Sequence, residues 1–350
     1  LKEMIGFTLK KISRTSYSPK SFNNKYGVPL SLLNLKQNDE FGVFEVGMDK
    51  KGEIDNLSKI IKPDLGIITN ISYAHAKNFK NINLIAEAKA EIMNNIKNGG
   101  TILLNKDDNF YLSHKNYALK KKLKVISFGI MSRFAMTKLL RIKKIKNKYE
   151  LFINVNGLFV SFYSYNNNKN NVYNILATLA SINLYTDIQK LKKDIFLNFK
   201  TPKGRGDISK IKLKDKKIFL VDETYNSNPL SLKTAIENYD KIESKNSKKY
   251  LILGDMLELG KHSIVQHKLI SKILNKTKIN HVYVIGKHIK ETFKGLKPNK
   301  KGNILNNKIG IIDLINKDLN NNDYLMIKGS HSTGLHNITT NLKKRILYAI

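Results

Sequence analysis

The segments Leu65-Gly-Ile-Ile-Thr-Asn-Ile71 and Thr101-Ile-Leu-Leu104 decide the fold class. Both are short runs of apolar and β-branched residues, which is typical of buried strands. Between them, the pattern of Leu84–Ile96 predicts a helix. A strand, a helix and a second strand in this order form a parallel βαβ unit. The sequence therefore predicts an α/β fold with mostly parallel sheets.

The same alternation of strand and helix patterns continues along the chain. Only Tyr149–Tyr165 interrupts it, because its apolar residues turn near Asn156-Gly157 and so predict an antiparallel β-hairpin. Further strands are predicted at Phe41–Val46, Lys124–Phe128, Ile218–Val221, Tyr250–Leu253, His281–Ile285 and Tyr324–Ile327. Further helices are predicted at Lys2–Ser13, Val172–Leu184, Pro229–Tyr239, Ser263–Leu274 and Gly334–Leu347.

The length of 350 residues is sufficient for two domains. The stretch Lys200-Thr-Pro-Lys-Gly-Arg-Gly206 is basic, contains Gly and Pro, and lies between a predicted helix and a predicted strand. Such a stretch is typical of a linker. We therefore expect one α/β domain at residues 1–202 and a smaller α/β domain at residues 203–350.

The composition is that of a folded, strongly basic protein. Lys and Arg total 62 against 28 Asp and Glu, which gives a formal net charge of +34, and hydrophobic residues make up 41%. Five of the 62 are Arg, so 57 are Lys, and these are spread along the whole chain together with many Asn. This pattern is typical of nucleotide-composition pressure on a gene. Because the lysines form no stripe with interleaved aromatic residues, the sequence predicts no nucleic-acid partner.

The chain contains no Cys. This excludes a disulfide scaffold, a thiolate zinc site and a cysteine nucleophile. It also fits a reducing compartment, so we expect a cytoplasmic protein. No run of about 18 apolar residues occurs, and we therefore expect no membrane insertion.

Polar residues follow the predicted strands of the first half. Glu45 lies at the end of one strand, and Asn70 and His75 follow the next. Ligands bind at the carboxyl ends of parallel strands in open α/β sheets, so these side chains are candidates for a site. Lys89 lies among small residues in Ala86-Glu-Ala-Lys-Ala-Glu-Ile92. No complete Gly-x4-Gly-Lys-Ser/Thr phosphate loop is present, because Gly260-Lys261 is followed by His262.

The second half adds the motifs Gly204-Arg205-Gly206, Asp222-Glu-Thr-Tyr-Asn-Ser-Asn-Pro229, Leu253-Gly-Asp-Met-Leu-Glu-Leu-Gly260 and Lys328-Gly-Ser330. In this order, and together with the segments around Glu45, Asn70 and Lys89, they resemble the Mur ligases. Tyr225–Pro229 and Leu253–Gly260 are similar to the members that add D-alanyl-D-alanine to a UDP-N-acetylmuramoyl-tripeptide.

The resemblance implies an ATP-dependent ligase of peptidoglycan precursor synthesis that uses ATP and Mg²⁺. The peptide carboxylate attacks the γ-phosphate to give an acyl phosphate, and the dipeptide amine then displaces phosphate. Residues 1–202 would form the central ATP-binding domain, and residues 203–350 a Rossmann-like C-terminal domain.

The resemblance also assigns roles in the first half. Glu45, His75 and Lys89 correspond to metal ligands, with Lys89 carrying a carbamate formed from its amine and CO2. A lysine can form one when burial lowers its pKa and leaves the amine neutral. His75 and Lys89 would act in catalysis together with Arg205, whose planar guanidinium suits the γ-phosphate. The structural alternatives are an ion pair for Glu45, a loop contact for His75 and a solvated surface lysine for Lys89.

Nucleotide and substrate contacts complete the implied site. The nucleotide contacts are Asn70, Arg205, Asp222, Asn226 and Asn228. The contacts to the incoming dipeptide are Asp255, Glu258, Lys328 and Ser330. The alternative for Asn226 and Asn228 is a strand-to-helix turn, with Pro229 in the first turn of the helix.

The chain begins with Leu1-Lys-Glu-Met-Ile, which resembles the helix that follows the phosphate loop in the family. We therefore expect the intact gene to encode that loop and an N-terminal substrate domain, and we expect residues 1–350 alone to be inactive. The implied partners are the UDP-linked tripeptide and D-alanyl-D-alanine, and the protein is expected to be a monomer. Two alternatives stay open: another ligase, such as a different muramyl ligase or folylpolyglutamate synthase, and a non-catalytic protein that has lost the loop.

Overall fold

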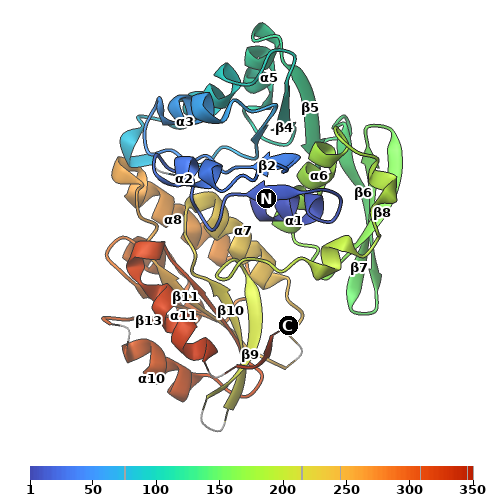
Figure 1. The fold of residues 1–350 in the computed structure, drawn as a ribbon. Coiled ribbons are helices and arrows are strands. Elements are labelled where there is room, and N and C mark those ends of the chain that lie inside the picture. The colour runs from blue at the N-terminus through green and yellow to red at the C-terminus, as the bar shows by residue number, and fades with distance from the viewer. Residues whose placement is uncertain (75, 214–215, 245, 308, 345, 350) are drawn as a thin grey trace. The chain divides into compact units, whose positions relative to one another are not determined.

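The computed structural model in Figure 1 describes residues 1–74, 76–213, 216–244, 246–307, 309–344 and 346–349. They form two compact units, which are described separately. Unit 1 comprises Leu1–Ile71 and Asn78–Phe199, and unit 2 comprises Ser72–Lys77 and Lys200–Ile350. The chain thus passes into unit 2 three residues before the boundary predicted between residues 202 and 203. No sequence pattern indicated that the short segment 72–77 groups with unit 2.

Unit 1 contains a six-stranded sheet in the order β3-β4-β5-β6-β7-β8. Its first four strands pair in parallel, and the last three form an antiparallel meander. The bounds are β3 Leu65–Ile68, β4 Thr101–Asn105, β5 Lys124–Gly129, β6 Thr137–Ile145, β7 Lys148–Val155 and β8 Leu158–Ser164. A separate parallel pair consists of β1 Thr15–Tyr17 and β2 Phe41–Val43.

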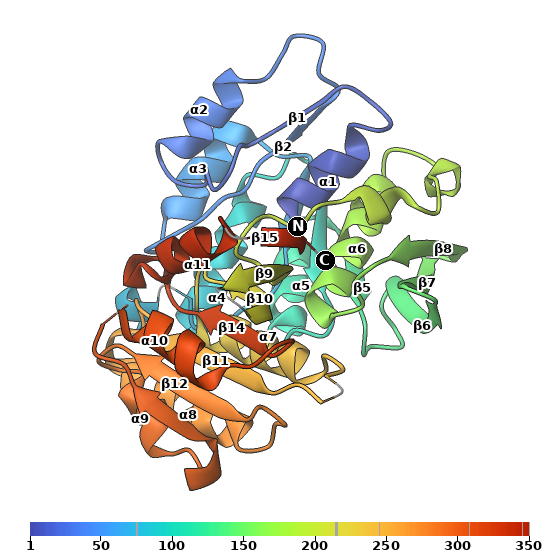
Figure 2. The ribbon, with the colours of Figure 1, turned by 90° about the horizontal axis from the view of Figure 1, so that it is seen from below.

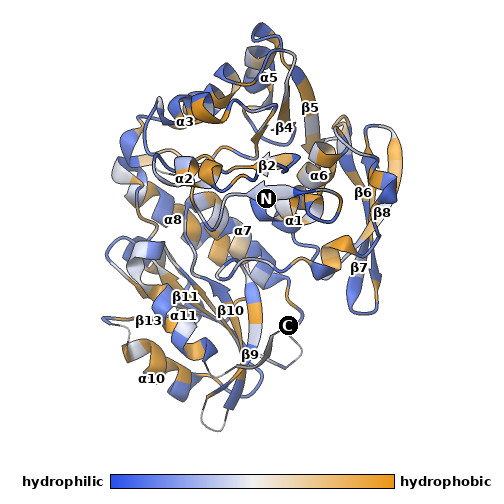
Figure 3. Cartoon of the chain, viewed as in Figure 1, coloured by the Kyte–Doolittle hydropathy of each residue, from blue (hydrophilic) through white to orange (hydrophobic). Residues whose placement is uncertain are grey.

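The helices of unit 1 connect and cover these strands. Their bounds are α1 Lys2–Leu9, α2 Gly27–Leu33, α3 Glu53–Ile61, α4 Ile82–Ala90, α5 Tyr111–Lys120 and α6 Lys169–Ile182. Both ribbon views show α6 beside β6 and β7, at the start of the antiparallel part of the sheet (Figures 1 and 2). The turn between β7 and β8 is the more hydrophobic end of this meander, and the turn between β6 and β7 is the hydrophilic end (Figure 3).

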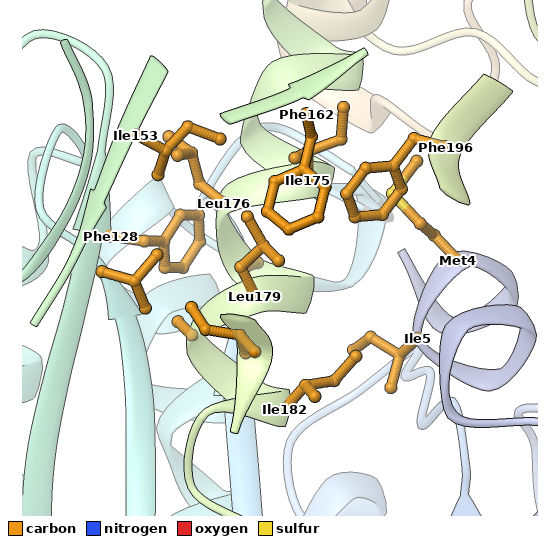
Figure 4. Close-up of a cluster of buried hydrophobic side chains, with 14 of the residues drawn as sticks. Met4, Ile5, Phe128, Ile153, Phe162, Ile175, Leu176, Leu179, Ile182 and Phe196 are labelled. Atoms are coloured by element: carbon orange, nitrogen blue, oxygen red, sulfur yellow. The ribbon is translucent and has the colours of Figure 1, made fainter. Parts of the chain in front are cut away.

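The core of unit 1 lies between α6 and its neighbours. Helix α6 is long and apolar on several faces, so it packs against α1 on one side and the sheet on the other. Figure 4 shows this cluster, which joins Ile175, Leu176, Leu179 and Ile182 of α6 to Met4, Ile5, Phe128, Ile153, Phe162 and Phe196. All of these side chains are buried. Burial of so many apolar side chains is the main source of stability for the unit.

Unit 2 contains a seven-stranded sheet in the order β13-β12-β11-β14-β10-β9-β15. The five strands from β13 to β10 pair in parallel, whereas β9 pairs antiparallel with both of its neighbours, β10 and β15. The strand bounds are β9 Asp207–Leu213, β10 Lys216–Glu223, β11 Lys249–Gly254, β12 His281–Ile285, β13 Lys301–Ile304, β14 Tyr324–Lys328 and β15 Ile346–Ala349. The helix bounds are α7 Pro229–Asp240, α8 Ser263–Leu274, α9 Lys290–Lys294, α10 Ile309–Asp318 and α11 Leu335–Lys343.

The predicted α/β class is confirmed, as is the hairpin of β7 and β8. Asn156 and Gly157 have φ values of 50° and 95°, which are the positive angles that a tight hairpin turn requires. Several predicted elements end earlier in the structure. The helix predicted at Lys2–Ser13 ends at Leu9, the helix predicted at Leu84–Ile96 ends as α4 at Ala90, and the strand predicted at Leu65–Ile71 ends at Ile68. The helix predicted at Gly334–Leu347 ends at Lys343, and the strand predicted at Phe41–Val46 ends at Val43. Among the described residues, no helix is long and apolar enough to cross a membrane.

Candidate active site

Glu45 lies two residues beyond β2 and is held by the segment that precedes α2. Nδ2 of Asn23 donates a hydrogen bond to Oε1 of Glu45 over 2.9 Å. The backbone amide of Glu45 donates to Oγ of Ser18 over 3.3 Å, and the amide of Gly47 donates to the carbonyl oxygen of Asn23 over 2.7 Å. One carboxylate oxygen of Glu45 is therefore fixed by Asn23, which the sequence-based site did not include.

Lys89 lies in the last turn of α4, between the buried residues Ala88 and Ala90. Burial lowers the pKa of Lys89, and the carboxylates of Asp108 and Glu45 oppose that shift. The structure therefore places Lys89 within electrostatic range of Glu45. A lowered pKa increases the fraction of neutral amine, which is the form that captures CO2.

Asn70 follows β3, and the backbone on either side of it is held by Asn105 at the end of β4 and by Asp108 beyond that strand. Nδ2 of Asn105 donates to the carbonyl oxygen of Thr69 over 3.0 Å, and the amide of Ile71 donates to Oδ2 of Asp108 over 2.8 Å. The side chain of Asn70 is exposed. Asp108 was absent from the predicted site, although its position just after a parallel strand was a signal that could have indicated it.

A buried histidine contacts the backbone of α4, the helix that carries Lys89. Nε2 of His114, on α5, is 3.1 Å from the carbonyl oxygen of Ala86, and the imidazole is almost fully buried. Burial lowers the pKa of His114, and the charge of Lys89 adds to the shift. His114 is therefore a neutral support for the helix that carries Lys89.

The predicted metal site is described only in part and stays a prediction. His75 lies outside the described residues, and the described part of the chain contains no group of three His, Asp, Glu or Cys side chains arranged to hold a metal. The carboxylate of Glu45 and a carbamate on Lys89 would supply oxygen ligands, which Mg²⁺ prefers. With Asp108 nearby, a carbamate would also leave three anionic groups together and so favour a bound cation. The residues present therefore fit Mg²⁺.

In unit 2, the side chain of Arg205 packs against Tyr225, in the segment that follows β10. Its guanidinium carbon lies 4.1 Å from the centroid of the Tyr225 ring, and the amide of Tyr225 donates to the carbonyl oxygen of Gly204 over 3.0 Å. Gly204 has a φ of +77°, and a Cβ there would lie 3.0 Å from the Tyr225 nitrogen. This position therefore requires glycine. The stacked ring restricts the exposed guanidinium of Arg205.

Asp222, at the end of β10, shares a lysine with Asp207. Nζ of Lys343 donates to Oδ2 of both carboxylates, at 2.5 Å in the case of Asp222. Oδ1 of Asp222 accepts from the backbone amide of Thr224 over 3.0 Å and from its hydroxyl over 2.6 Å. The carboxylate of Asp222 is therefore held rigidly, and Lys343 is a further residue that the sequence did not indicate.

A second buried ion pair joins Lys328, at the end of β14, to Glu223, at the end of the neighbouring strand β10. Nζ of Lys328 lies 3.3 Å from Oε2 of Glu223 and donates to the carbonyl oxygen of Asn226 over 2.9 Å. Burial lowers the pKa of Lys328, and the charge of Glu223 opposes that shift. Burial also raises the pKa of Glu223, while Lys328 lowers it. Lys328 thereby links the end of β14 to the turn that contains Asn226.

The turn before α7 has a structural role that the sequence had offered as an alternative. Oδ1 of Asn228 accepts from the amide of Ser231, and Oγ of Ser231 accepts from the amide of Asn228, both over 2.9 Å. This reciprocal pair is a capping box, with Pro229 at the first helical position. Asn226 is exposed, and its side-chain oxygen accepts from the amide of Ser227 over 2.8 Å.

Asp255, after β11, anchors the loop that follows β12. Its two carboxylate oxygens accept backbone amides of residues 287–289 over 2.7 to 3.0 Å, and the side chain is 7% exposed. Gly286 has a φ of +137°, and a Cβ there would lie 2.6 Å from the Asp255 carboxylate. The structure therefore gives Asp255 a structural role, and its contact with substrate stays a prediction.

Glu258 lies in the loop after β11, and Ser330 follows β14. Oγ of Ser330 donates to the carbonyl oxygen of Ser227 over 3.1 Å and accepts the amide of Leu257 over 2.8 Å. Glu258 is exposed and has a φ of 64°. Ser330 thus connects two loops, after β10 and after β11.

His267, on α8, holds the loop after β11. It is fully buried: Nε2 accepts the amide of Met256 over 3.1 Å, and Nδ1–H donates to the carbonyl oxygen of Ser263 over 2.8 Å. These two bonds require a neutral imidazole. Burial accordingly lowers the pKa of His267.

Comparison with known proteins identifies the family to which this arrangement belongs. Residues 1–182 match the family model described as the Mur ligase middle domain, and residues 209–331 match the one described as Mur ligase, glutamate ligase domain. The chain belongs to the Mur ligase family. The predicted family and the predicted ligase class of enzyme are therefore confirmed.

Curated relatives in this family extend over nearly the whole chain. The UDP-N-acetylmuramoyl-tripeptide–D-alanyl-D-alanine ligase of Buchnera aphidicola (subsp. Acyrthosiphon pisum) is 32% identical over 98% of this chain and 74% of its own length. The Bacillus subtilis ligase of the same name is 28% identical over 97% of this chain and 72% of its own length. The chain thus spans about three-quarters of these Mur ligases.

Solved Mur ligase structures share the fold. MurF from Acinetobacter baumannii superposes with a TM-score of 0.84 at 23% identity, covering 98% of this chain and 73% of that protein. MurF from Thermotoga maritima, solved in complex with ADP, gives a TM-score of 0.83 at 23% identity, covering 98% of this chain and 76% of that protein. The fold is therefore that of this branch of the Mur ligases.

Proposed function

We propose that this Mur ligase adds D-alanyl-D-alanine to a UDP-N-acetylmuramoyl-tripeptide, with ATP as the energy source, in peptidoglycan precursor synthesis. The observation that carries the proposal is the 32% identity over 98% of this chain to a ligase named for that reaction. The same similarity runs through both units, so it includes both groups of candidate site residues. We also propose residues 1–202 and 203–350 as the two catalytic domains.

The first group of residues would serve phosphate transfer. Glu45, His75 and Lys89, the last as its carbamate, would hold Mg²⁺, which neutralises phosphate charge when bound. Carbamate formation joins the neutral amine nitrogen to CO2 and releases one proton. The burial of Lys89 and its nearness to Glu45 support this role. Asn70 would contact the nucleotide from the exposed turn after β3.

The second group would bind the nucleotide and the acceptor. Arg205, already restrained by Tyr225, would orient the γ-phosphate. The nucleotide contacts would include Asp222, Asn226 and Asn228. The dipeptide contacts would be Asp255, Glu258, Lys328 and Ser330. Lys328 and Ser330 support the proposal best, because their hydrogen bonds join the strand ends and loops that would form the acceptor site.

The proposed reaction has two steps. A carboxylate oxygen of the tripeptide attacks the γ-phosphorus of ATP, and ADP leaves. The neutral amine of D-alanyl-D-alanine then attacks the acyl carbon, phosphate leaves, and the amine nitrogen loses one proton. The developing phosphate charge requires fixed cations more than covalent catalysis. The restrained guanidinium of Arg205 meets that requirement.

A panel of acceptors tests the proposal. Protein expressed from the whole reading frame that encodes this chain is incubated with ATP, Mg²⁺, UDP-N-acetylmuramoyl-tripeptide and D-alanyl-D-alanine, D-glutamate or L-alanyl-L-alanine. We expect a pentapeptide product by mass spectrometry, with one ADP per bond, only with D-alanyl-D-alanine. Ligation of another acceptor in preference, or no ligation, would contradict the proposal. Glutamate addition to a folate would support the folylpolyglutamate alternative.

A further inference from the structure

An exposed apolar tip lies at one end of the antiparallel meander of unit 1. It consists of two neighbouring loops, the one between β5 and β6 and the turn between β7 and β8. The amide of Asn156 donates to the carbonyl oxygen of Met136 over 2.7 Å and joins them. The tip residues and their exposed fractions are Met131 66%, Phe134 82%, Leu158 36% and Phe159 72%. Large apolar side chains gathered in this way mark an interaction site.

The protein holds this tip in a defined conformation. Nζ of Lys106 donates to the carbonyl oxygen of Phe134, and Nζ of Lys138 donates to that of Arg133, each over 2.7 Å. Oxygens of Asp107 accept the amides of residues 130–132 over 2.6 to 2.9 Å. Phe134 is therefore presented to solvent by a fixed loop that cations surround.

The strands behind the tip form a basic surface. Segment 131–165, every residue of which is described, contains one acidic residue, Glu150. Its seven basic residues are Arg133 and Lys138 at the tip, Arg141 along β6, and Lys143, Lys144, Lys146 and Lys148 at the opposite end of the meander, around the turn between β6 and β7. Glu150 accepts from Oγ of Ser161 over 3.1 Å and lies 3.9 Å from Lys193. The surface is thus strongly positive, with its single acid already paired.

The aromatic rings of this basic surface are not arranged to stack nucleic-acid bases. The guanidinium of Arg141 lies 4.2 Å from the centroid of Phe152, and Nζ of Lys148 lies 3.7 Å from the centroid of Tyr163. These cations cover the ring faces on which the bases of a single-stranded nucleic acid would have to stack. The most exposed apolar side chains, those of Phe134 and Phe159, lie instead at the tip, where Nζ of Lys106 is 5.8 Å from the centroid of the Phe134 ring.

We propose that this end of unit 1 docks reversibly on an anionic lipid bilayer. Lysines and arginines next to a membrane bind lipid phosphates electrostatically, while a few apolar side chains enter the boundary between headgroups and acyl chains. The tip supplies those apolar side chains, and the cations of Lys106, Arg133 and Lys138 beside it supply the charge complementarity. No helix crosses the membrane in this arrangement, which agrees with the described helices.

Vesicle co-sedimentation at physiological salt tests the proposal on the chain itself. We expect binding to phosphatidylcholine vesicles that contain phosphatidylglycerol, and not to phosphatidylcholine alone. The double variant Phe134→Ser/Phe159→Ser leaves every charge unchanged and should weaken binding about tenfold. The matched control Leu30→Ser/Leu33→Ser removes leucines that are 50% and 82% exposed elsewhere in unit 1, and should bind as the parent does.

Other outcomes overturn the proposal. Equal binding by the tip variant would mean that the net charge alone attracts the vesicles. Tighter binding to single-stranded RNA than to anionic vesicles, unaffected by the tip variant, would favour a nucleic-acid surface. Hydrogen exchange gives a second measurement on the unmodified chain. We expect vesicles to slow exchange at residues 130–136 and 156–160, and unchanged exchange there would reject the docking surface.

Discussion

Removal of the shared lysine in unit 2 should destabilise that unit strongly. The change Lys343→Met keeps an unbranched side chain of nearly the same length but deletes the cation that bridges Asp207 and Asp222. Oδ1 of Asp222 would retain its two bonds to Thr224, whereas Oδ2 would lose its partner. Two carboxylates would then face each other without a cation.

The exposed fractions set the size of the effect. The side chain of Asp222 is 6% exposed and that of Lys343 15%, so this contact is buried. Breaking a buried ion pair costs about 3 to 5 kcal/mol. Asp207 is 26% exposed and can regain water, so we expect the lower end, about 3 kcal/mol of unfolding free energy. The pKa of Lys343 is raised above its ordinary 10.5, so its contribution is complete at neutral pH and disappears only as pH rises beyond that value.

Urea unfolding followed by far-ultraviolet circular dichroism measures this effect at neutral pH. The control Lys344→Met removes the neighbouring exposed lysine and should change the unfolding free energy by less than about 0.5 kcal/mol. Adding Asp207→Asn to Lys343→Met should recover part of the loss, because it removes the repulsion between the carboxylates. A loss below about 1 kcal/mol in Lys343→Met, the range of surface pairs, would refute the reasoning.

Two further stability effects follow from unit 2. Asn228→Ala removes the cap of α7 and should cost about 1 kcal/mol in the same urea assay, whereas an unchanged midpoint would show that the capping box contributes nothing. The lowered pKa of His267 means that the unfolded state binds its proton more readily, so stability should decline as pH falls below 6.5. His267→Gln should lack that component; an identical slope of stability against pH in parent and variant would contradict it.

The fold was predictable from the sequence where local pattern and pairing agree. Strands such as β4 and β12 are short apolar runs between turn residues, and their predicted positions hold. The helix predicted to extend to Leu347 was wrong at its end, because Ile346–Ala349 continues an apolar spacing that also suits a helix. Its strand form depends on pairing with β9, which is remote in sequence and invisible to local propensity.

The candidate site was predictable only as far as the family motifs extend. They indicated Glu45 and Lys89, which the structure brings into electrostatic range. The residues that hold the site act over long sequence separations: Asn23 is 22 residues from Glu45, and Lys343 is 121 residues from Asp222. One lysine among 57 carries no local signal that would set Lys343 apart. Such partners become visible only in the folded chain.

The carbamate on Lys89 is the most specific chemical claim about this ligase. With ¹³C-labelled bicarbonate, ¹³C nuclear magnetic resonance of the protein from the whole reading frame should show a carbamate carbon. That signal should be absent in Lys89→Ala and present in Lys97→Ala, whose exposed lysine pairs with Asp64 in the same unit.

Ligation by Lys89→Ala, with and without added formate or acetate, tests the claim most directly. We expect turnover to fall by orders of magnitude, because the alanine supplies no oxygen ligand. Short carboxylates should restore part of the turnover and bicarbonate should not, since no amine remains to capture CO2. Full turnover in Lys89→Ala, or a large loss that no carboxylate restores together with no carbamate signal in the parent, would contradict the proposed metal centre.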